Sequence, residues 1–217
     1  MIVDLNIQDK KIIIVGGGNE AQKRINSLLK QGCDITIIAD SVNSQITKIS
    51  KTKKIKIIKQ KIADAKFISK LKPNLIITTT NDKKVNQKII NAAKKKGITV
   101  YSSDNPEDSD FSNPAIINFE NMIQIAIFTG GRSPVMSKKI KEKSEKALRK
   151  IITKEDIAQI KIQKKARGLA KEVIATQEQR KECLRSIMSD NGIDQLIKDG
   201  QIKKAEKRAI TILRNWK

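Results

Sequence analysis

The segment from residue 11 to residue 29 joins a strand, a glycine turn and a helix with no linker between them. Lys11–Val15 is apolar after its first residue, as expected of a strand buried on both faces of a sheet. Three glycines follow at once, at positions 16 to 18. Apolar side chains then recur at the i, i+4, i+7 and i+8 spacing of a helix with one buried face, at Ala21, Ile25, Leu28 and Leu29. This order predicts the first unit of a parallel α/β sheet.

The alternation of apolar runs and helical stripes continues to about residue 101. We expect further strands at 34–39, 54–58, 75–79 and 98–101. We expect one short helix at 65–71, and a second that ends in lysines before Gly97 and whose apolar stripe comprises Val85, Ile89, Ile90 and Ala93. Helices that alternate with apolar strands are typical of a doubly wound parallel sheet. The fold class predicted for this region is therefore an α/β Rossmann domain.

Two β-rich runs, 115–119 and 122–128, follow a polar loop. Glu120 and Asn121 separate the runs as in a hairpin. Two strands are too few to bury their own apolar faces, because an isolated hairpin is marginal in water. We therefore expect a homodimer built around residues 115–150.

The rest of the chain has helical character. A helix is expected to begin near Val135, with later breaks near Thr153, 190–192 and Gly200. We divide the chain into a Rossmann domain at 1–112, a small α+β dimerisation region at 113–150 and a helical C-terminal domain at 151–217.

Composition excludes several kinds of chemistry. The 217 residues include no histidine, which excludes a histidine-based triad, a histidine general base and a histidine metal ligand. Cys33 and Cys183 lie 150 positions apart and cannot form a CxxC motif, so we expect free thiols and no metal site. No apolar run approaches 18 residues and the N-terminus lacks a secretory signal. We therefore expect a cytoplasmic chain without a membrane partner.

The chain is strongly basic, with 45 lysines and arginines, 23 acidic residues and a net charge of +22. Such a charge suits an acidic partner, which can be nucleic acid, an anionic surface or a polyanionic small molecule. A general bias toward lysine would instead leave a solvated surface. The composition does not separate these two interpretations.

The motif Gly16-x-Gly18-x-x-Ala21 lies between a strand and a helix, as a dinucleotide-binding turn requires. The glycines permit a tight turn and a close backbone approach to a diphosphate, which the helix N-terminus would bind. Asp40 lies at the end of the second predicted strand, 19 residues after Ala21, where an acid that binds the ribose is expected. No arginine follows it to accept a 2′-phosphate, which favours NAD over NADP.

Polar residues follow the fourth and fifth predicted strands, on the edge of the sheet where ligands bind. Thr79 and Asn81 are candidates for cofactor contacts, although Asn81 or Asp82 can equally cap the next helix. Asp104 is the carboxylate best placed for proton transfer near a bound nicotinamide, and a loop or capping role remains equally open.

A set of motifs appears along the chain in the order of one known family. They are residues 16–24, Thr80-Asn81-Asp82 with Val85-Asn86, Asp104-Asn105-Pro106, Phe111, Pro114-Ala115-Ile116 and Gly130-Gly131-Arg132-Ser133-Pro134-Val135. With these motifs the chain resembles precorrin-2 dehydrogenase, which is also the N-terminal half of siroheme synthase. The resemblance is dense from about residue 7 to 150, and its Gly-Gly-x-Ser-Pro segment is more specific than the glycine turn.

The resemblance implies that NAD⁺ takes a hydride from precorrin-2 to give sirohydrochlorin, within a homodimer. Some members of the family also insert Fe²⁺ as a substrate to give siroheme. Asn19, Glu20, Asp40 and Ser41 match the NAD contacts of the family, and Asp104 matches its key carboxylate. The candidate cofactor-binding residues are Gly16, Gly18, Asn19, Glu20, Ala21, Asp40, Ser41, Thr79 and Asn81.

The same resemblance implies substrate contacts in the segment Gly130, Gly131, Arg132 and Ser133. Precorrin-2 carries eight carboxylates, which a basic cleft would attract, and Lys138 and Lys139 are further candidates for binding them. The chain departs from the family at Arg132, where Thr or Asn is common, and at Asp40, where the usual Ala-Pro pair is Ala-Asp.

Two other classes of function each explain part of the sequence. A regulatory domain that senses NAD without catalysis explains the Rossmann half but not the segment 130–134. A nucleic-acid-binding protein explains the charge, but the chain lacks stacking aromatic residues and any such binding motif. We therefore expect precorrin-2, and no nucleic acid, as the partner.

Overall fold

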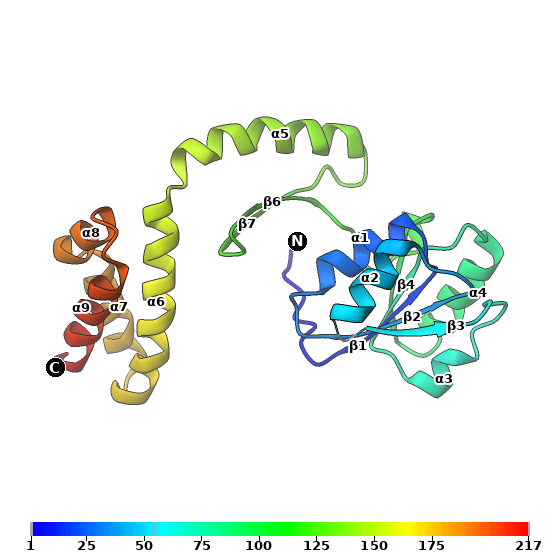
Figure 1. The fold of residues 1–217 in the computed structure, drawn as a ribbon, viewed down its shortest axis with the longest axis horizontal. Coiled ribbons are helices and arrows are strands. Elements are labelled where there is room, and N and C mark those ends of the chain that lie inside the picture. The colour runs from blue at the N-terminus through cyan, green and yellow to red at the C-terminus, as the bar shows by residue number, and fades with distance from the viewer. Residues whose placement is uncertain (1, 54, 217) are drawn as a thin grey trace. The chain divides into compact units, whose positions relative to one another are not determined.

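A computed structural model describes residues 2–53 and 55–216 (Figure 1). The chain divides into two compact units, one ending at Asn113 and the other starting at Pro114. No helix within the described ranges has the length and apolar character needed to cross a membrane.

The first unit contains a parallel five-stranded sheet in the order β3-β2-β1-β4-β5. Its strands are β1 (Lys11–Val15), β2 (Asp34–Ala39), β3 (Ile55–Lys59), β4 (Leu75–Thr78) and β5 (Thr99–Ser102). The predicted strands agree with these to within one residue at each end, and position 54 of the predicted third strand lies outside the described residues. The order reverses between β1 and β4, which creates the crevice where ligands bind in doubly wound sheets.

Helices cover both faces of this sheet. They are α1 (Asn19–Leu28), α2 (Ser44–Thr52), α3 (Phe67–Leu71) and α4 (Lys83–Lys94), with a short 3₁₀ turn η1 (Pro106–Asp108) after β5. Ile12 and Ile14 of β1 pack with α1 and α2, whereas Ile13 and Val15 pack with α3 and α4. Burial of each such side chain contributes about 1.5–3 kcal/mol. The predicted Rossmann fold is confirmed.

The helix α2 was not predicted. Its N-terminus is capped by Asn43, whose side chain accepts a hydrogen bond of 2.8 Å from the Ile46 backbone N–H. Ile46 is the one buried residue of α2, so its apolar stripe is too short to stand out in the sequence.

The second unit begins with an antiparallel hairpin of β6 (Ala115–Phe119) and β7 (Ile123–Ile127). Glu120 and Asn121 form the turn with φ angles of 51° and 58°, a conformation typical of two-residue hairpin loops, which confirms the predicted hairpin. Ile117 and Phe119 pack with residues of α5 and α6.

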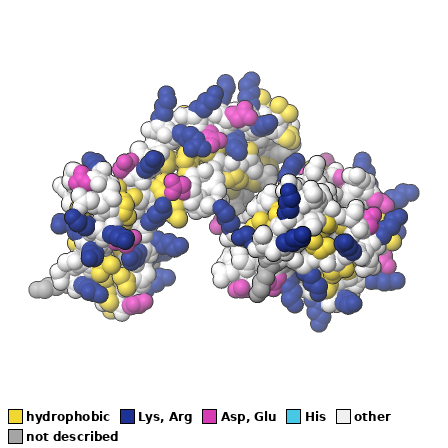
Figure 2. Space-filling model, viewed as in Figure 1, with side chains coloured by type: hydrophobic (Ala, Val, Ile, Leu, Met, Phe, Trp, Pro, Cys, Tyr) yellow, Lys and Arg dark blue, Asp and Glu magenta, His cyan; other side chains and the backbone are white. Residues whose placement is uncertain are grey.

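The remaining helices of the second unit are α5 (Pro134–Ile151), α6 (Lys154–Val173), α7 (Gln177–Met188), α8 (Asn191–Lys198) and α9 (Ile202–Arg214). The predicted breaks near Thr153, 190–192 and Gly200 are present. A further break at 174–176 was missed. Thr176 caps α7 there, accepting a hydrogen bond of 3.2 Å from the Gln179 N–H. Lysine and arginine side chains are spread over the visible surface of this unit and of the first (Figure 2).

Candidate active site

The loop after β1 passes very close to the end of β4. Gly16 has a φ of +117°, and a Cβ built on it would lie 2.4 Å from Thr79 Oγ1. The Thr79 hydroxyl donates a hydrogen bond of 2.9 Å to the Val15 carbonyl, and the Gly16 N–H donates one of 3.0 Å to Ile38. Glycine is therefore required at position 16 both by conformation and by space.

Gly17 was not among the predicted site residues, yet it has the closest contact of the loop. A Cβ on Gly17 would lie 2.0 Å from the Ser41 carbonyl oxygen and 2.9 Å from Val42 Cα. The Gly17 carbonyl also accepts a hydrogen bond of 2.9 Å from the Asn43 N–H. The loop after β1 thus packs backbone to backbone against the loop after β2. Gly17, the middle one of three consecutive glycines, was visible in the sequence, but the backbone contact that requires a glycine there was not.

Gly18 provides open space at the start of α1. A Cβ on Gly18 would meet no atom within 4 Å, and no side chain among the described residues caps the helix there. The first backbone N–H groups of a helix favour anions, through hydrogen bonding and the helix dipole. The tight turn at Gly16 and Gly17 and the open helix end at Gly18 fit the diphosphate of a dinucleotide.

The loop after β2 carries Asp40 and Ser41 beside this turn. Both residues are exposed, and the Asp40 carboxylate accepts a hydrogen bond of 2.8 Å from the Ser41 N–H. The Asn43 amide ties the loop to α1 by donating to Gln22 Oε1 at 2.9 Å and to Asn19 Oδ1 at 3.3 Å. The structure therefore brings the predicted residues Asn19, Asp40 and Ser41 to one edge of the sheet.

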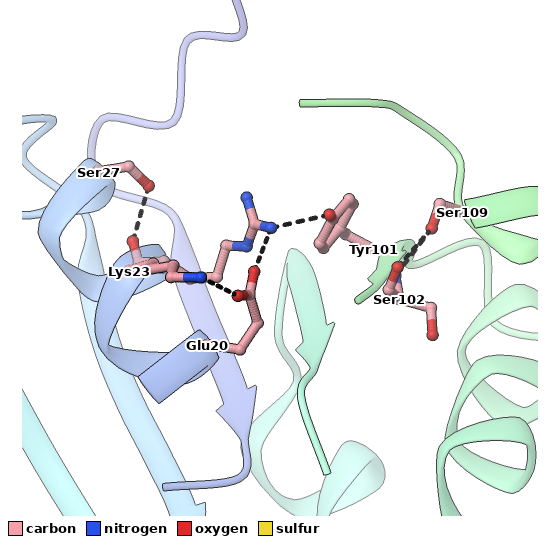
Figure 3. A network of polar contacts seen from close by, with 7 residues as sticks. Glu20, Lys23, Ser27, Tyr101, Ser102 and Ser109 are labelled. Carbon is pink, nitrogen blue, oxygen red and sulfur yellow. Dashed lines mark hydrogen bonds and ion pairs between the residues drawn. The ribbon is translucent and has the colours of Figure 1, made fainter. Parts of the chain in front are cut away.

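Glu20 forms ion pairs within α1, and one of its partners, Arg24, links the helix to β5. Its carboxylate binds Lys23 Nζ at 3.1 Å and also the Arg24 guanidinium, which donates to Tyr101 Oη at 3.0 Å. Glu20 and Tyr101 reach toward each other in Figure 3, and the Arg24 guanidinium carbon lies 4.7 Å from the Tyr101 ring centroid. Partial burial acts to raise the pKa of Glu20, but the hydrogen bonds and charges of Lys23 and Arg24 lower it below its usual value. A contact of Glu20 with the cofactor stays a prediction.

The loop after β4 contains the cap of the next helix. Of the two capping candidates, Asp82 caps α4 by accepting a hydrogen bond of 3.0 Å from the Val85 N–H. Asn81 is exposed beside it, and its predicted cofactor contact stays a prediction.

Asp104 is an exposed residue two positions after β5. Its Oδ1 accepts a hydrogen bond of 2.6 Å from the Ser102 hydroxyl. Partial burial acts to raise the pKa of Asp104, but hydrogen bonds from the Ser102 and Asn86 side chains outweigh it, and the pKa lies below its usual value. Asp104 is therefore a carboxylate at neutral pH and is able to accept a proton.

The glycine pair of the second unit forms a turn before α5. Gly130 and Gly131 have φ angles of 64° and 74°, which favour glycine. Ser133 caps α5 by accepting a hydrogen bond of 3.2 Å from the Met136 N–H, and the Thr129 and Ser137 hydroxyls lie 2.9 Å apart. Arg132 is exposed in this turn. The described part of the chain contains no cluster of three or more Cys, Asp or Glu side chains suited to a metal ion.

Comparison with known proteins gives siroheme synthases among the relatives of this chain. A siroheme synthase of Psychromonas ingrahamii is 30% identical over 199 residues, covering 92% of this chain and 40% of the relative. A siroheme synthase of Methylococcus capsulatus is 33% identical over 141 residues, covering 65% of this chain and 29% of the relative. The chain thus spans less than half the length of the curated relatives that it matches.

A solved structure named as SirC, precorrin-2 dehydrogenase, has the same fold. Its TM-score with this chain is 0.70 at 23% identity, and the match covers 96% of this chain and 99% of the other. The model of the family described as "Putative NAD(P)-binding" matches residues 3–115, which include the glycine turn, Asp40 and Asp104. The chain therefore belongs to this NAD(P)-binding family, and the resemblance to siroheme synthases predicted from its motifs is confirmed.

Proposed function

We propose that this chain oxidises precorrin-2 to sirohydrochlorin with NAD⁺ as the hydride acceptor. The proposal rests on the NAD(P)-binding family, on the siroheme synthase relatives and on the fold shared with a precorrin-2 dehydrogenase. The observation that carries it is Asp104, an accessible carboxylate held in its ionised form at the edge of the sheet where ligands bind.

The cofactor would be held by the loops after β1, β2 and β4. The backbone of residues 16–18 and the N-terminus of α1 would bind the diphosphate, and Asp40 would accept hydrogen bonds from the ribose hydroxyls. Asn19, Ser41 and Thr79 border the same turn. A carboxylate at position 40 would repel a 2′-phosphate, which favours NAD over NADP.

The oxidation removes one hydride and one proton from the substrate. The nicotinamide of the bound cofactor supplies the hydride acceptor. Asp104 is proposed as the base that takes the proton, because it is ionised and accessible and the chain has no histidine. The reaction then balances as precorrin-2 and NAD⁺ giving sirohydrochlorin, NADH and a proton.

The carboxylates of the substrate would be bound by the basic turn before α5. Gly130, Gly131 and Arg132 are exposed there, and Ser133 beside them is half-buried. Lys138 and Lys139 are exposed on the first turns of α5 and add two charges to the same segment. Steering of a polyanionic substrate by such a segment would weaken with salt.

A homodimer through residues 113–150 is part of the proposal, with 151–217 as a separate helical domain. Phe128, Val135, Met136 and Ile140 expose apolar side chains in this region, with 78% of Val135 accessible. The hairpin of β6 and β7 pairs with no further strand among the described residues. A second copy would cover both features.

Insertion of Fe²⁺ into sirohydrochlorin is a second candidate reaction for the same site. It requires removal of protons from ring nitrogens, and Asp104 is available to accept them. Here Fe²⁺ is a substrate rather than a resident cofactor.

The test is incubation of the pure protein with precorrin-2 and NAD⁺, with and without Fe²⁺. We expect NADH absorbance to rise in step with sirohydrochlorin, and siroheme to form only if iron insertion also occurs. Binding of NAD⁺ without turnover would instead indicate a sensor domain. Tight, salt-dependent binding of a fluorescent DNA duplex together with no NAD⁺ binding would favour the nucleic-acid alternative.

A further inference from the structure

Three polar side chains are buried around the end of β4, the end of β5 and the first turns of α4. Thr78 and Ser102 are both 0% exposed, and Asn86 is 1% exposed. A buried polar group is costly unless it is hydrogen-bonded, and core positions next to a sheet are ordinarily apolar. These three residues therefore call for an explanation other than packing.

Thr78 and Ser102 lie opposite each other in the parallel pairing of β4 with β5. Thr78 Oγ1 donates a hydrogen bond of 3.1 Å to Ser102 Oγ, and Ser102 Oγ donates one of 2.6 Å to Asp104 Oδ1. An ionised carboxylate only accepts hydrogen bonds, so the direction of both bonds follows from the charge of Asp104. The Ser102 backbone is held as well, since its N–H donates to Ser109 Oγ at 2.8 Å (Figure 3).

Asn86 lies on the first turn of α4, and Thr80 orients its amide. Thr80 Oγ1 donates to Asn86 Oδ1 at 2.6 Å, and Asn86 Nδ2 donates to the Thr80 carbonyl at 2.9 Å. These two bonds fix which side of the Asn86 side-chain amide carries the oxygen and which carries the nitrogen. The Asn86 side chain helps to lower the pKa of Asp104.

We propose that Ser102 is a positioning residue that holds the Asp104 carboxylate in one orientation, and that Thr78 orients the Ser102 hydroxyl in turn. The catalytic part of this inference rests on the proposed function, whereas the hydrogen-bonding part does not. The arrangement provides the carboxylate with a charge-assisted hydrogen bond from the buried Ser102 hydroxyl, while Asp104 itself stays accessible to substrate.

The first test measures the ionisation of Asp104 directly, without substrate. The carboxyl ¹³C resonance of Asp104 is assigned by its loss in Asp104→Asn and followed through a pH titration of the full chain. Ser102→Ala should raise the pKa of Asp104, because it removes a donor to the carboxylate. Thr78→Val keeps the side-chain shape and should raise it less.

Ser103→Ala is the matched control for the titration. The Ser103 hydroxyl is on the neighbouring residue and is buried, yet it has no hydrogen-bond partner among the described residues. Its loss should leave the pKa of Asp104 unchanged. An unchanged pKa in both Ser102→Ala and Thr78→Val would overturn the inference, and Thr78→Val keeps the test decisive if Ser102→Ala does not fold.

The second test is the pH profile of dehydrogenation. For Ser102→Ala we expect the acidic limb of kcat/KM to move to higher pH and kcat to fall by up to about a hundredfold, as for a misplaced catalytic group. NAD⁺ affinity should not change. A lower kcat with an unmoved acidic limb would indicate a merely structural role and count against the inference. If the wild-type chain shows no turnover while the titration behaves as expected, the proposed function fails and the hydrogen-bond network stands.

Discussion

Replacing Gly17 with alanine should force apart the two loops that form the base of the nucleotide site. The added Cβ would lie 2.0 Å from the Ser41 carbonyl oxygen, whereas ordinary contact begins at 3.4 Å. The loops must therefore separate by about 1.4 Å (3.4 − 2.0), since overpacked atoms move apart rather than overlap. Both neighbouring atoms, on Ser41 and Val42, belong to the backbone, so no side-chain rotation relieves the clash.

The expected cost follows from this geometry. Overpacking of a closely packed site costs about 1–3 kcal/mol. In a unit of this size, each kcal/mol lowers Tm by about 4–8 °C, so a decrease of about 4–24 °C is expected. The same movement displaces Asn43 and weakens its bonds to Gly17 and Asn19, so NAD⁺ affinity should fall as well.

Gly18→Ala is the matched control, because its Cβ meets no atom within 4 Å. Its free energy of unfolding should stay within about 1 kcal/mol of wild type, the scale of a changed helix cap. The methyl group would nevertheless occupy the space proposed for the diphosphate, and the Kd for NAD⁺ should rise at least about tenfold. Calorimetric melting and titration with NAD⁺ measure both quantities. A Gly17→Ala protein that melts like wild type would refute the steric argument, and a Gly18→Ala protein with wild-type affinity would refute the location of the diphosphate.

Asp40→Ala should reduce the preference for NAD⁺ over NADP⁺ in binding titrations, because it removes the charge that repels a 2′-phosphate; an unaltered ratio would remove Asp40 from the ribose site. Asp104→Asn should slow dehydrogenation by about 10²–10⁴-fold with NAD⁺ affinity nearly intact, and a wild-type rate would place the base elsewhere. Light scattering at micromolar concentration should give a dimer, and a monomer contradicts that part of the proposal. Hydrogen bonds from Arg208 hold the pKa of Asp190 below its usual value. The contribution of these bonds to the free energy of unfolding is therefore present above the unfolded-state pKa of Asp190 and is lost as pH falls through its folded-state pKa. Thermal melts should show this acid loss in wild type and much less of it in Asp190→Asn.

Elements that are buried on all sides were predictable from the sequence. The strand β1 is a run of apolar residues because both faces of the sheet are covered, and its buried side chains leave a clear signal. The helix α2 leaves a weak signal because Ile46 is its one buried residue. The break before α7 contains no glycine or proline, and its detectable mark was Thr176 three residues before Gln179, the spacing of a capping box.

Candidate site residues were predictable where their place in the fold follows from their position directly after a strand. Gly16, Gly18 and Asp104 follow strands directly, so their place at the edge of the sheet could be inferred. The contact between Thr78 and Ser102 could not, because it depends on the register of β4 against β5, which the two short sequences do not specify. The requirement for Gly17 depends in the same way on the approach of the loop after β2.

The strand order itself distinguishes the roles of the two acidic residues. Along the carboxyl edge of the sheet, Asp40 follows β2, the glycine turn follows β1, Thr79 follows β4 and Asp104 lies beyond β5. The strands β2 and β5 are three spacings apart, about 14 Å at about 4.8 Å each. A dinucleotide whose diphosphate lies at the glycine turn would extend in both directions from it. In domains with such a glycine turn, an acid binds one ribose of the dinucleotide. Asp40 is placed to be that acid, so the nicotinamide end would lie on the other side of the turn, toward β4 and β5. The opposite orientation would bring the hydride acceptor to Asp40, whose carboxylate accepts a hydrogen bond from the Ser41 N–H of its own exposed loop, whereas that of Asp104 accepts one from the buried Ser102 hydroxyl.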